Sequence, residues 1–260
     1  MIVFYRDRFH SGPLPIPPES PWLLHGAGVF ETMLWTRGRL AWVGRHLERA
    51  AAGLEALELG PLPRDLDVLL AEVVRHNDLA ERTARVTLHL GPEREGGGVV
   101  PMVTAVPYAP PTLEPVEITI FDGLHVSSLS RFKTHAYLPF REATRRARAM
   151  GAWDAAFLDG DGHFTETGCG ALLFGDDNGL VAPKTSWKLP SIALAAVAAE
   201  RPVREAPVRL KNLGRFRYAW VLNSLIGALP IDRIGAQDYV PDLDTAAALR
   251  SLIWQDEDGE

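Results

Sequence analysis

The hydrophobic pattern of the first hundred residues alternates between strand-like and helix-like stretches. Apolar and β-branched runs at VFETMLW and RLAWV stand on either side of Thr36-Arg37-Gly38, and this pattern predicts a β-hairpin. Apolar positions at helical spacing then predict helices over about 45–58 and about 63–78, the second opened by Pro63. RVTLHLG and VVPMVTAV follow as predicted strands. The order β-β-α-α-β-β predicts a small α+β domain.

Strand-like patterns dominate the second half of the chain. We predict strands at VEITIFDGLHV, WDAAFLD, HFTET, ALLFG and GLVAP, and a strand pair within AWVLNSLIGALPIDRIG. Helices are predicted at PFREATRRARAMG, SIALAAVAAE and LDTAAALRSLIWQ. Because the strands outnumber the helices and pair locally, we expect a mixed sheet or partial barrel rather than a doubly wound parallel sheet. The predicted fold class is therefore α+β or mixed α/β.

A proline-rich stretch marks the expected domain boundary. AVPYAPPTLEP (105–115) contains four prolines in eleven residues, which favours an extended connector. We therefore expect a small N-terminal domain over 1–107, a linker over 108–115 and a larger C-terminal domain over 116–260.

Composition and charge exclude several classes of protein. The net charge of −6, with no basic run beyond REATRRAR, argues against a general nucleic-acid binder. No stretch approaches the roughly 20 apolar residues of a membrane span, and MIVFYRDRFH lacks the apolar core of a signal peptide. The single cysteine, Cys169, cannot form an internal disulfide. A reducing cytoplasmic location is the expectation.

Several partial motifs do not support a function. GAGVFE (26–31) begins like a dinucleotide-binding fingerprint, but Glu31 stands where the third glycine is needed. Asp159-Gly160-Asp161-Gly162 resembles a calcium loop, yet the twelfth position is Gly170 instead of a bidentate Glu. The eight histidines show no paired spacing for zinc, so no metal is expected. Cys169 lacks an activating partner and is interpreted as a small residue in a crowded strand.

Lysine is scarce, since only four of the 27 basic residues are lysines. A lysine can lose its proton and form a Schiff base with a carbonyl, which arginine cannot do. Lys133 lies 33 residues before Glu166. Pyridoxal phosphate requires a lysine for its aldehyde, a carboxylate at its pyridine nitrogen, and cationic and N–H groups for its phosphate. The sequence offers a candidate for each requirement.

The chain resembles the fold-type IV pyridoxal-phosphate enzymes, also called class IV aminotransferases. This family includes branched-chain and D-amino-acid aminotransferases and 4-amino-4-deoxychorismate lyase. The resemblance extends from residue 25 to 231 and rests on four blocks in the family's order: HGAGVFETM with GRLAWVGRHLERAAAGLEAL, FKTHAYLPFREATRRARAMGAWDAAFLDGDGHFTE, LVAPKTSWKLPSI and AWVLNSLIGALPI. It implies pyridoxal phosphate as the cofactor, bound between two domains, and a homodimer acting on a small amino substrate.

The resemblance also implies roles for three charged residues. Lys133 matches the Schiff-base lysine, which also serves as acid and base, and Glu166 matches the glutamate at the pyridine nitrogen. Arg49, in His46-Leu47-Glu48-Arg49, matches the phosphate-binding arginine. Without the resemblance, the alternatives are a strand-end surface lysine, an exposed strand carboxylate, and a solvated helical arginine paired with a nearby acid.

Further positions match the phosphate and substrate sides of the family's site. Leu189-Pro190-Ser191-Ile192-Ala193 matches a turn whose helix N-terminus presents N–H groups to the phosphate. Asn223-Ser224-Leu225 matches a second phosphate-side turn. Tyr137 is expected near the cofactor's phenolic oxygen, with aromatic packing under the helix as the alternative, while Thr32 and Leu225 are candidate substrate contacts. Ser191 and Ala193 replace the family's Gly and Thr, so one hydroxyl contact of the phosphate turn is missing.

Three functions remain open at this stage. NSLIGALP and GVFETM resemble the lyase subgroup, which converts 4-amino-4-deoxychorismate to 4-aminobenzoate and pyruvate. The alternative is an aminotransferase that acts on D-amino or branched-chain amino acids. The third possibility is a degenerate homologue that binds the cofactor without catalysis. The fold alone does not decide among them.

Overall fold

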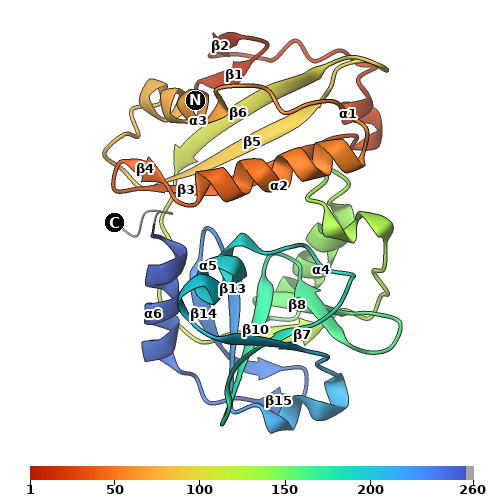
Figure 1. The fold of residues 1–260 in the computed structure, drawn as a ribbon, viewed down its shortest axis with the longest axis vertical. Coiled ribbons are helices and arrows are strands. Elements are labelled where there is room, and N and C mark those ends of the chain that lie inside the picture. The colour runs from red at the N-terminus through yellow and green to blue at the C-terminus, as the bar shows by residue number, and fades with distance from the viewer. Residues whose placement is uncertain (256–260) are drawn as a thin grey trace. The chain divides into compact units, whose positions relative to one another are not determined.

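The computed structural model describes residues 1–255 and divides into two compact units (Figure 1). The first unit comprises Met1–Pro110, Phe132–Ala136 and 254–255, and the second comprises Pro111–Arg131 and Tyr137–Ile253. The chain first leaves the first unit inside the proline-rich stretch. It returns for the five residues Phe132–Ala136, which the sequence-based scheme places in the larger domain. The last five residues of that scheme's range 116–260 lie outside the described part.

The first unit is built on a six-stranded antiparallel sheet with the order β2-β1-β6-β5-β3-β4. Its three helices are α1, α2 and α3. The strands are β1 (Val3–Tyr5), β2 (Arg8–His10), β3 (Val29–Thr36), β4 (Arg39–Leu40), β5 (Ala84–Pro92) and β6 (Val99–Pro107), and the helices are α1 (Pro21–His25), α2 (Val43–Ala56) and α3 (Leu66–His76).

The predicted hairpin and helices of this unit are present. Arg37 and Gly38 join β3 to β4 with φ angles of 52° and 80°, the positive values that a tight two-residue hairpin turn requires. The second helix begins at Leu66 rather than Pro63, because Asp65 before it adopts a left-handed conformation with φ 55°. The sequence did not predict β1, β2 or α1, which are short and carry little periodicity.

Apolar residues on one face of this sheet form a core with α2 and α3. The alternation along β3 directs Val29 and Met33 into this core and directs Phe30 and Thr32 to the opposite face. Leu54 of α2 and Leu70 of α3 are fully buried in the same cluster. The strand pattern therefore determines which residues of β3 meet the helices.

The second unit contains a mixed nine-stranded sheet with the order β12-β11-β10-β13-β14-β7-β8-β9, and β15 pairs with β14. The pairs β11–β12, β14–β7 and β7–β8 are parallel. The strands are β7 (Val116–Ile120), β8 (Asp154–Leu158), β9 (Phe164–Thr167), β10 (Ala171–Asp176), β11 (Gly179–Pro183), β12 (Val203–Ala206), β13 (Tyr218–Asn223), β14 (Gly227–Ile234) and β15 (Gln237–Asp238).

This sheet is curled, because β9 at one end of the strand order also lies against β10 and β11. The predicted mixed α/β fold with a partial barrel is thus confirmed. Three α-helices and two 3₁₀ segments accompany the sheet: α4 (Leu138–Ala149), α5 (Ile192–Glu200), α6 (Leu243–Ile253), η1 (Ser128–Arg131) and η2 (Leu210–Arg215).

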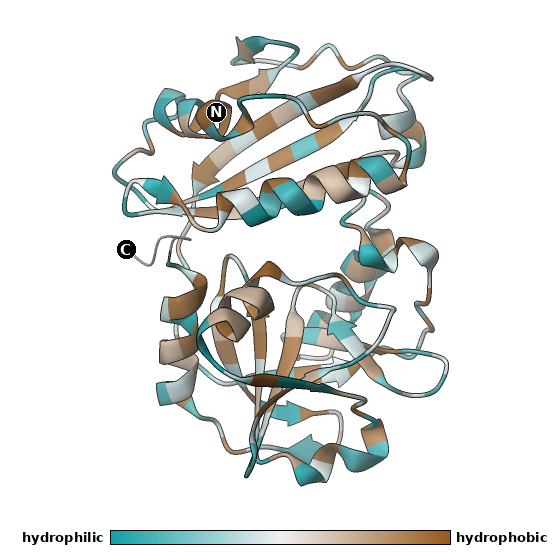
Figure 2. Cartoon of the chain, in the orientation of Figure 1, coloured by the Kyte–Doolittle hydropathy of each residue, from teal (hydrophilic) through white to brown (hydrophobic). Residues whose placement is uncertain are grey.

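The central strands of this sheet are buried almost throughout. β10 and β13 each bury a run of consecutive residues, and both are predominantly apolar in Figure 2. Such continuous apolar runs are typical of strands covered on both faces. Among the described residues, no helix has the length and apolar character needed to cross a membrane.

Candidate active site

Lys133 is held at the edge of the first unit's sheet by backbone hydrogen bonds. The Phe30 N–H donates to the Lys133 carbonyl at 2.8 Å, and the His135 N–H donates to the Gly28 carbonyl at 3.0 Å. A β-bridge joins Val29 to Thr134 between them. This pairing explains why Phe132–Ala136 belongs to the first unit. It also puts the side chains of Lys133 and Phe30 on the same face of the sheet.

The amine of Lys133 lies over an aromatic ring. Its Nζ is 4.4 Å from the centroid of the Phe30 ring, within the range of a cation–π contact. The side chain is only half-buried. The strand pairing and the ring contact together restrict where this amine can reach.

Two histidines that the sequence analysis did not single out pack beside this lysine segment. His89 Nδ1 lies 3.1 Å from His135 Nε2. The His135 ring stacks on Trp22 with centroids 5.1 Å apart and on Phe30 with centroids 5.8 Å apart. Burial lowers the pKa of His89 to about 4 and, together with the neighbouring His89, lowers the pKa of His135 to about 3. Both imidazoles are therefore neutral near pH 7.

Arg49 is paired with a buried acid. Its Nε donates to Glu31 Oε1 at 2.7 Å and its Nη2 donates to Glu31 Oε2 at 2.6 Å. The acid comes from strand β3, not from the arginine's own helix α2. Glu31 is 1% exposed and the Arg49 side chain is 14% exposed. The solvated helical ion pair, the alternative open from the sequence, is therefore replaced by a buried pair between two elements.

His46 completes this cluster on the same helix. Its Nδ1 lies 2.6 Å from Glu31 Oε2, and both side chains are almost fully buried. Burial favours the neutral acid at Glu31, but the charge of Arg49 and the contact with His46 outweigh burial and hold its pKa at about 2. Burial lowers the pKa of His46. The sequence signals for these residues were GVFET and HLER, but neither motif indicated that they meet.

Glu166 lies in the second unit, on β9. Its Oε1 accepts a hydrogen bond from the Leu189 N–H at 3.1 Å. The carboxylate thus connects β9 to the turn that precedes helix α5. Within this unit, the structure brings Glu166 together with the segment expected to bind phosphate.

Ser191 is the N-cap residue of α5. Its Oγ accepts from the Leu194 N–H at 3.2 Å, which is the usual N-cap hydrogen bond. The N–H groups of Ile192 and Ala193 lie in the first helical turn, where the helix supplies no partner of its own. Both residues are buried. The hydroxyl of Ser191 therefore caps the helix, and its neighbours contribute backbone donors.

Asn223 organises the turn after β13. Its Oδ1 accepts from the Leu225 and Ile226 N–H groups, each at 2.9 Å. Its Nδ2 donates to the Cys169 carbonyl at 2.9 Å. The amide therefore holds the backbone on both sides of Ser224 and connects this turn to the loop after β9. These three bonds are all to backbone groups, and Nδ2 also lies 3.9 Å from Cys169 Sγ, so the amide positions the turn.

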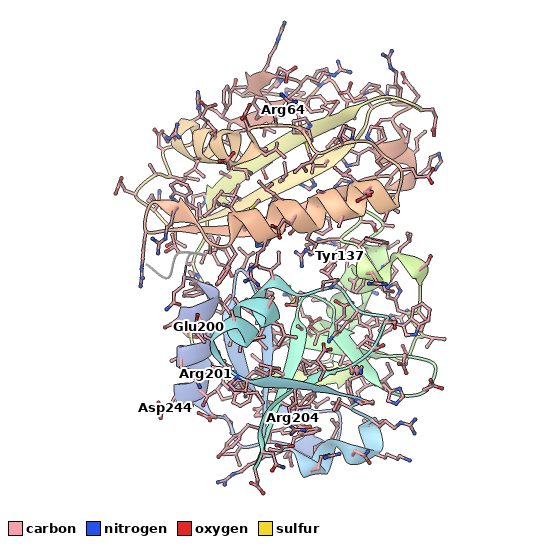
Figure 3. The ribbon with its side chains drawn as sticks, viewed as in Figure 1. Arg64, Tyr137, Glu200, Arg201, Arg204 and Asp244 are labelled. Atoms are coloured by element: carbon pink, nitrogen blue, oxygen red, sulfur yellow. The ribbon has the colours of Figure 1, made fainter. Side chains whose placement is uncertain are left out.

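Tyr137 precedes helix α4 (Figure 3) and donates its hydroxyl proton to the Gly168 carbonyl at 2.9 Å. Its ring stacks on Phe140 with centroids 4.8 Å apart. Burial, followed by the neighbouring Cys169, Glu166 and Asp154, raises the pKa of the phenol above its usual range. The aromatic packing that was the alternative for this residue is observed, and the hydroxyl is oriented by the loop.

The loop that receives Tyr137 is held by the buried Asp154. Thr144 Oγ1 donates to Asp154 Oδ1 at 2.7 Å, and the Cys169 N–H donates to Asp154 Oδ2 at 3.0 Å. A Cβ at Gly168 would lie 2.3 Å from Thr144 Oγ1 and 2.5 Å from Asp154 Oδ1. Only glycine fits this close approach. The sequence shows the glycines of TGCGA, but it does not show why glycine is needed at position 168.

The two candidate substrate residues occupy different units. Thr32 lies on β3 opposite Thr87, on the same sheet face as Phe30. Leu225 lies in the turn held by Asn223. Arg49, Lys133 and Thr32 thus belong to the first unit, and the other candidate residues belong to the second.

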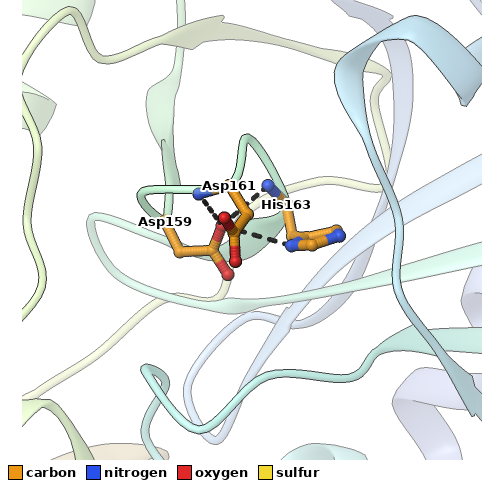
Figure 4. Close-up of side chains that lie close together, drawn as sticks. All are labelled: Asp159, Asp161 and His163. Atoms are coloured by element: carbon orange, nitrogen blue, oxygen red, sulfur yellow. Dashed lines mark hydrogen bonds and ion pairs between the residues drawn. The ribbon is translucent and has the colours of Figure 1, made fainter.

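The resemblance to a calcium loop is accounted for by a hairpin turn (Figure 4). Asp159, Asp161 and His163 lie close enough to be considered as metal ligands. However, Asp159 Oδ1 accepts from the N–H groups of Asp161 at 3.0 Å and His163 at 2.9 Å, as in an Asx turn. Arg209 Nε donates to His163 Nε2 at 2.8 Å, so the ring proton is on Nδ1, 3.3 Å from Asp159 Oδ1. These bonds engage Asp159 Oδ1 and both ring nitrogens of His163, which belong to two of the three candidate ligands.

A comparison with models of protein families identifies one family for this chain. The model for amino-transferase class IV matches residues 28–234. A search among curated proteins finds no match to this sequence.

Solved structures show the same fold at low sequence identity. A branched-chain aminotransferase from Thermoproteus uzoniensis, solved with norvaline, has a TM-score of 0.87 at 19% identity and covers 99% of this chain and 96% of its own. A hypothetical aminotransferase from Mycobacterium tuberculosis in its PLP-bound form has a TM-score of 0.84 at 22% identity, with 97% of each chain covered. A proposed 4-amino-4-deoxychorismate lyase from Legionella pneumophila has a TM-score of 0.84 at 22% identity, covering 94% and 97%.

Proposed function

The chain belongs to the class IV aminotransferase family, and from this premise we propose that it is a pyridoxal-phosphate lyase that converts 4-amino-4-deoxychorismate to 4-aminobenzoate and pyruvate. The observation that carries the lyase proposal is the Asn223-Ser224-Leu225 turn, whose sequence resembles the lyase subgroup. Asn223 holds this turn through three hydrogen bonds. A shaped turn of this kind presents the same backbone and hydroxyl groups each time a ligand binds.

The cofactor is pyridoxal phosphate, as predicted from the sequence. The chain lies in aminotransferase class IV, and a structural relative was solved in a PLP-bound form. The second unit has donor groups of the kind that bind a phosphate. Helix α5 offers N–H groups at Ile192 and Ala193, and the turn after β13 offers Ser224. The proposal assigns the cationic contact with the phosphate to Arg49.

Two further residues fit the reactive part of the cofactor. We assign the covalent bond with its aldehyde carbon to Lys133, whose backbone is paired with β3. Glu166 would accept a hydrogen bond from the pyridine nitrogen and would keep that nitrogen protonated. When bound in this way, pyridoxal phosphate supplies an electron sink for the bond broken in the substrate.

In the proposed reaction, Lys133 would act as the base once the substrate amine is bound to the cofactor. Its Nζ removes the proton from the ring carbon that bears the amine. The bond between the ring and the ether oxygen breaks, and the departing enolpyruvyl group takes up one proton to become pyruvate. The ring gains aromaticity as these groups leave. Tyr137 is held in a fixed orientation through its bond to Gly168.

The second candidate function is an aminotransferase of D-amino or branched-chain amino acids. It is favoured by the similarity to the branched-chain aminotransferase solved with norvaline. In that reaction Lys133 would remove the α-proton of an amino acid and return it to the cofactor carbon. The two candidate functions use the same lysine and differ in the bond that breaks next.

A direct assay separates the two functions. Aminodeoxychorismate is supplied to the purified protein loaded with pyridoxal phosphate, and pyruvate and 4-aminobenzoate are measured. Amino acids with a keto-acid acceptor are supplied in a parallel assay. Equal amounts of pyruvate and 4-aminobenzoate without amine transfer support the lyase, whereas keto-acid formation alone supports the aminotransferase.

A cofactor titration tests the remaining alternative, a degenerate homologue. Such a protein would bind the cofactor and turn over neither substrate. A protein that takes up no added pyridoxal phosphate would refute every enzymatic proposal made here. The homodimer that the resemblance implies is part of the same proposal, and sedimentation of the loaded protein measures it.

A further inference from the structure

Arg49 and Glu31 form a two-pronged hydrogen-bonded ion pair. The Nε to Oε1 distance is 2.7 Å and the Nη2 to Oε2 distance is 2.6 Å. Two parallel N–H···O bonds constrain the plane of the guanidinium as well as its position. The second donor edge of the group, formed by Nη1 and the remaining Nη2 proton, therefore has its direction set by Glu31.

Because Arg49 and Glu31 are largely buried, their ion pair keeps this geometry. Glu31 is 1% exposed and the Arg49 side chain is 14% exposed, so water competes weakly for either group. A buried ion pair adds little net stability compared with apolar side chains of similar volume. A gain in stability therefore explains the presence of this buried pair poorly. Orientation of the Arg49 guanidinium explains it better.

His46 holds the acid from a second direction. Its Nδ1 lies 2.6 Å from Oε2, the oxygen that also accepts from Arg49 Nη2. Because the Glu31 carboxylate oxygen can only accept, His46 donates from this nitrogen. Glu31 is thus fixed between strand β3, on which it lies, and two side chains of α2. The negative charge of Glu31 is balanced by the positive charge of Arg49.

We propose that Glu31 is a positioning residue that makes this protein selective for a phosphorylated cofactor. It acts through Arg49, whose second donor edge it orients for the phosphate group. The inference rests on the proposed function, in which Arg49 binds the phosphate of pyridoxal phosphate. It adds that the selectivity for the phosphate depends on a carboxylate that makes no contact with the cofactor.

The test compares two cofactors that differ only in the phosphate. Cofactor-free protein is titrated with pyridoxal phosphate and with pyridoxal, and the two Kd values are obtained from the visible absorption band of the bound form. In Glu31→Gln, we expect the affinity for pyridoxal phosphate to fall by about tenfold or more while the affinity for pyridoxal is unchanged. An equal loss for both cofactors, or no loss for either, would overturn the proposal.

Glu48→Gln is the matched control. Glu48 is adjacent to Arg49 on α2 and exposed, and the change removes the same charge by the same chemistry. We expect both Kd values to remain at the wild-type level. A loss of phosphate selectivity in this control equal to that in Glu31→Gln would show that net charge, not orientation, is responsible, and the proposal would be wrong.

A double-mutant cycle tests whether Glu31 acts through Arg49. Arg49→Gln should itself remove most of the preference for pyridoxal phosphate. Adding Glu31→Gln to that variant should then change the ratio of the two Kd values no further. A further loss of the same size would overturn the proposed route.

A conservative variant covers the case in which Glu31→Gln does not fold. Glu31→Asp keeps the charge but withdraws the carboxylate by one methylene, so the two-pronged geometry is lost. It should lose several-fold in the ratio of the two affinities, and an unchanged ratio would contradict the proposal. Failure of the wild-type protein to bind pyridoxal phosphate is a separate result, which refutes the proposed function itself.

Discussion

The Phe30 N–H donates a hydrogen bond of 2.8 Å to the carbonyl of Lys133, so the proposed catalytic lysine is a continuation of the first unit's sheet. The same phenylalanine contacts the lysine amine through its ring. Backbone and side chain of Lys133 are therefore both positioned by one residue of β3. Precise placement of a reactive group by a rigid strand is what efficient proton transfer requires.

Replacing Lys133 tests the assignment of the reactive amine. We expect Lys133→Ala to lose the visible band of covalently bound cofactor and nearly all activity, because no other group would hold the aldehyde. Borohydride treatment followed by peptide mass spectrometry should place the cofactor on Lys133 in the wild-type protein. Lys211→Ala is the control and should retain band and activity. Full activity in Lys133→Ala would refute the assignment.

Asn223→Ala should weaken both the turn and cofactor binding. The substitution removes two accepted hydrogen bonds and one donated bond that hold the backbone around Ser224. We expect a loss of about 1–3 kcal/mol in the free energy of unfolding and a higher Kd for pyridoxal phosphate. Urea unfolding and a cofactor titration measure the two effects.

The control for this prediction is Asn178→Ala, a change at an exposed turn position. It should alter the free energy of unfolding by less than about 0.5 kcal/mol. An Asn223→Ala protein as stable as this control would show that the turn does not depend on the amide.

Gly168→Ala should destabilise the second unit. The added Cβ would lie 2.3 Å from Thr144 Oγ1 and 2.5 Å from Asp154 Oδ1, in a buried site. Relieving the overlap would disturb the bonds of a buried carboxylate, so we expect a loss of about 2 kcal/mol or more. Gly160→Ala is the matched control, because a Cβ there meets no atom within 4 Å. Equal unfolding temperatures for the two variants would contradict the prediction.

The histidine pair should make stability depend on pH. Burial lowers the pKa of His89 to about 4 and, with the neighbouring His89, that of His135 to about 3, so the unfolded chain binds more protons than the folded one. Their contribution is fully present above an unfolded pKa of about 6.5 and is lost as pH falls through the folded values. For His89 alone the loss is about 3 kcal/mol between pH 6.5 and 4.

Urea unfolding at a series of pH values measures this dependence. In His89→Phe, stability should fall less steeply between pH 6.5 and 4 than in the wild-type protein. His25→Phe changes an exposed histidine and should leave the slope unaltered. Parallel curves for the wild-type and His89→Phe proteins would show that His89 does not contribute.

Much of the fold could be predicted because its signals are local. The alternating residues of VFETMLW predicted β3, and helical spacing of apolar residues predicted α2 and α3. Their ends were less predictable: Asp65 moved the start of α3 through a left-handed backbone conformation. The short strands β1 and β2 have too few residues for a periodic pattern, and they are identified only by their pairing with each other and by the pairing of β1 with β6.

The residues of the candidate site could be predicted where they lie in continuous sequence motifs. Lys133, Glu166 and Arg49 were identified with the blocks around them. The sequence singled out Glu31 only as the residue in place of the third glycine of a dinucleotide-binding fingerprint. His89 and His135 carried no signal, because their pairing joins residues 46 positions apart.

The sequence alone determined the types of the longer elements, the family resemblance and the candidate reactive residues, since each is encoded in neighbouring residues. Only the tertiary structure decided that Glu31 meets Arg49 across 18 residues and that the Lys133 segment pairs with β3. Such contacts depend on strand register and on which helix covers which sheet face. These are properties of the packed chain as a whole, because burying one face of the sheet selects the partners that the other elements must supply.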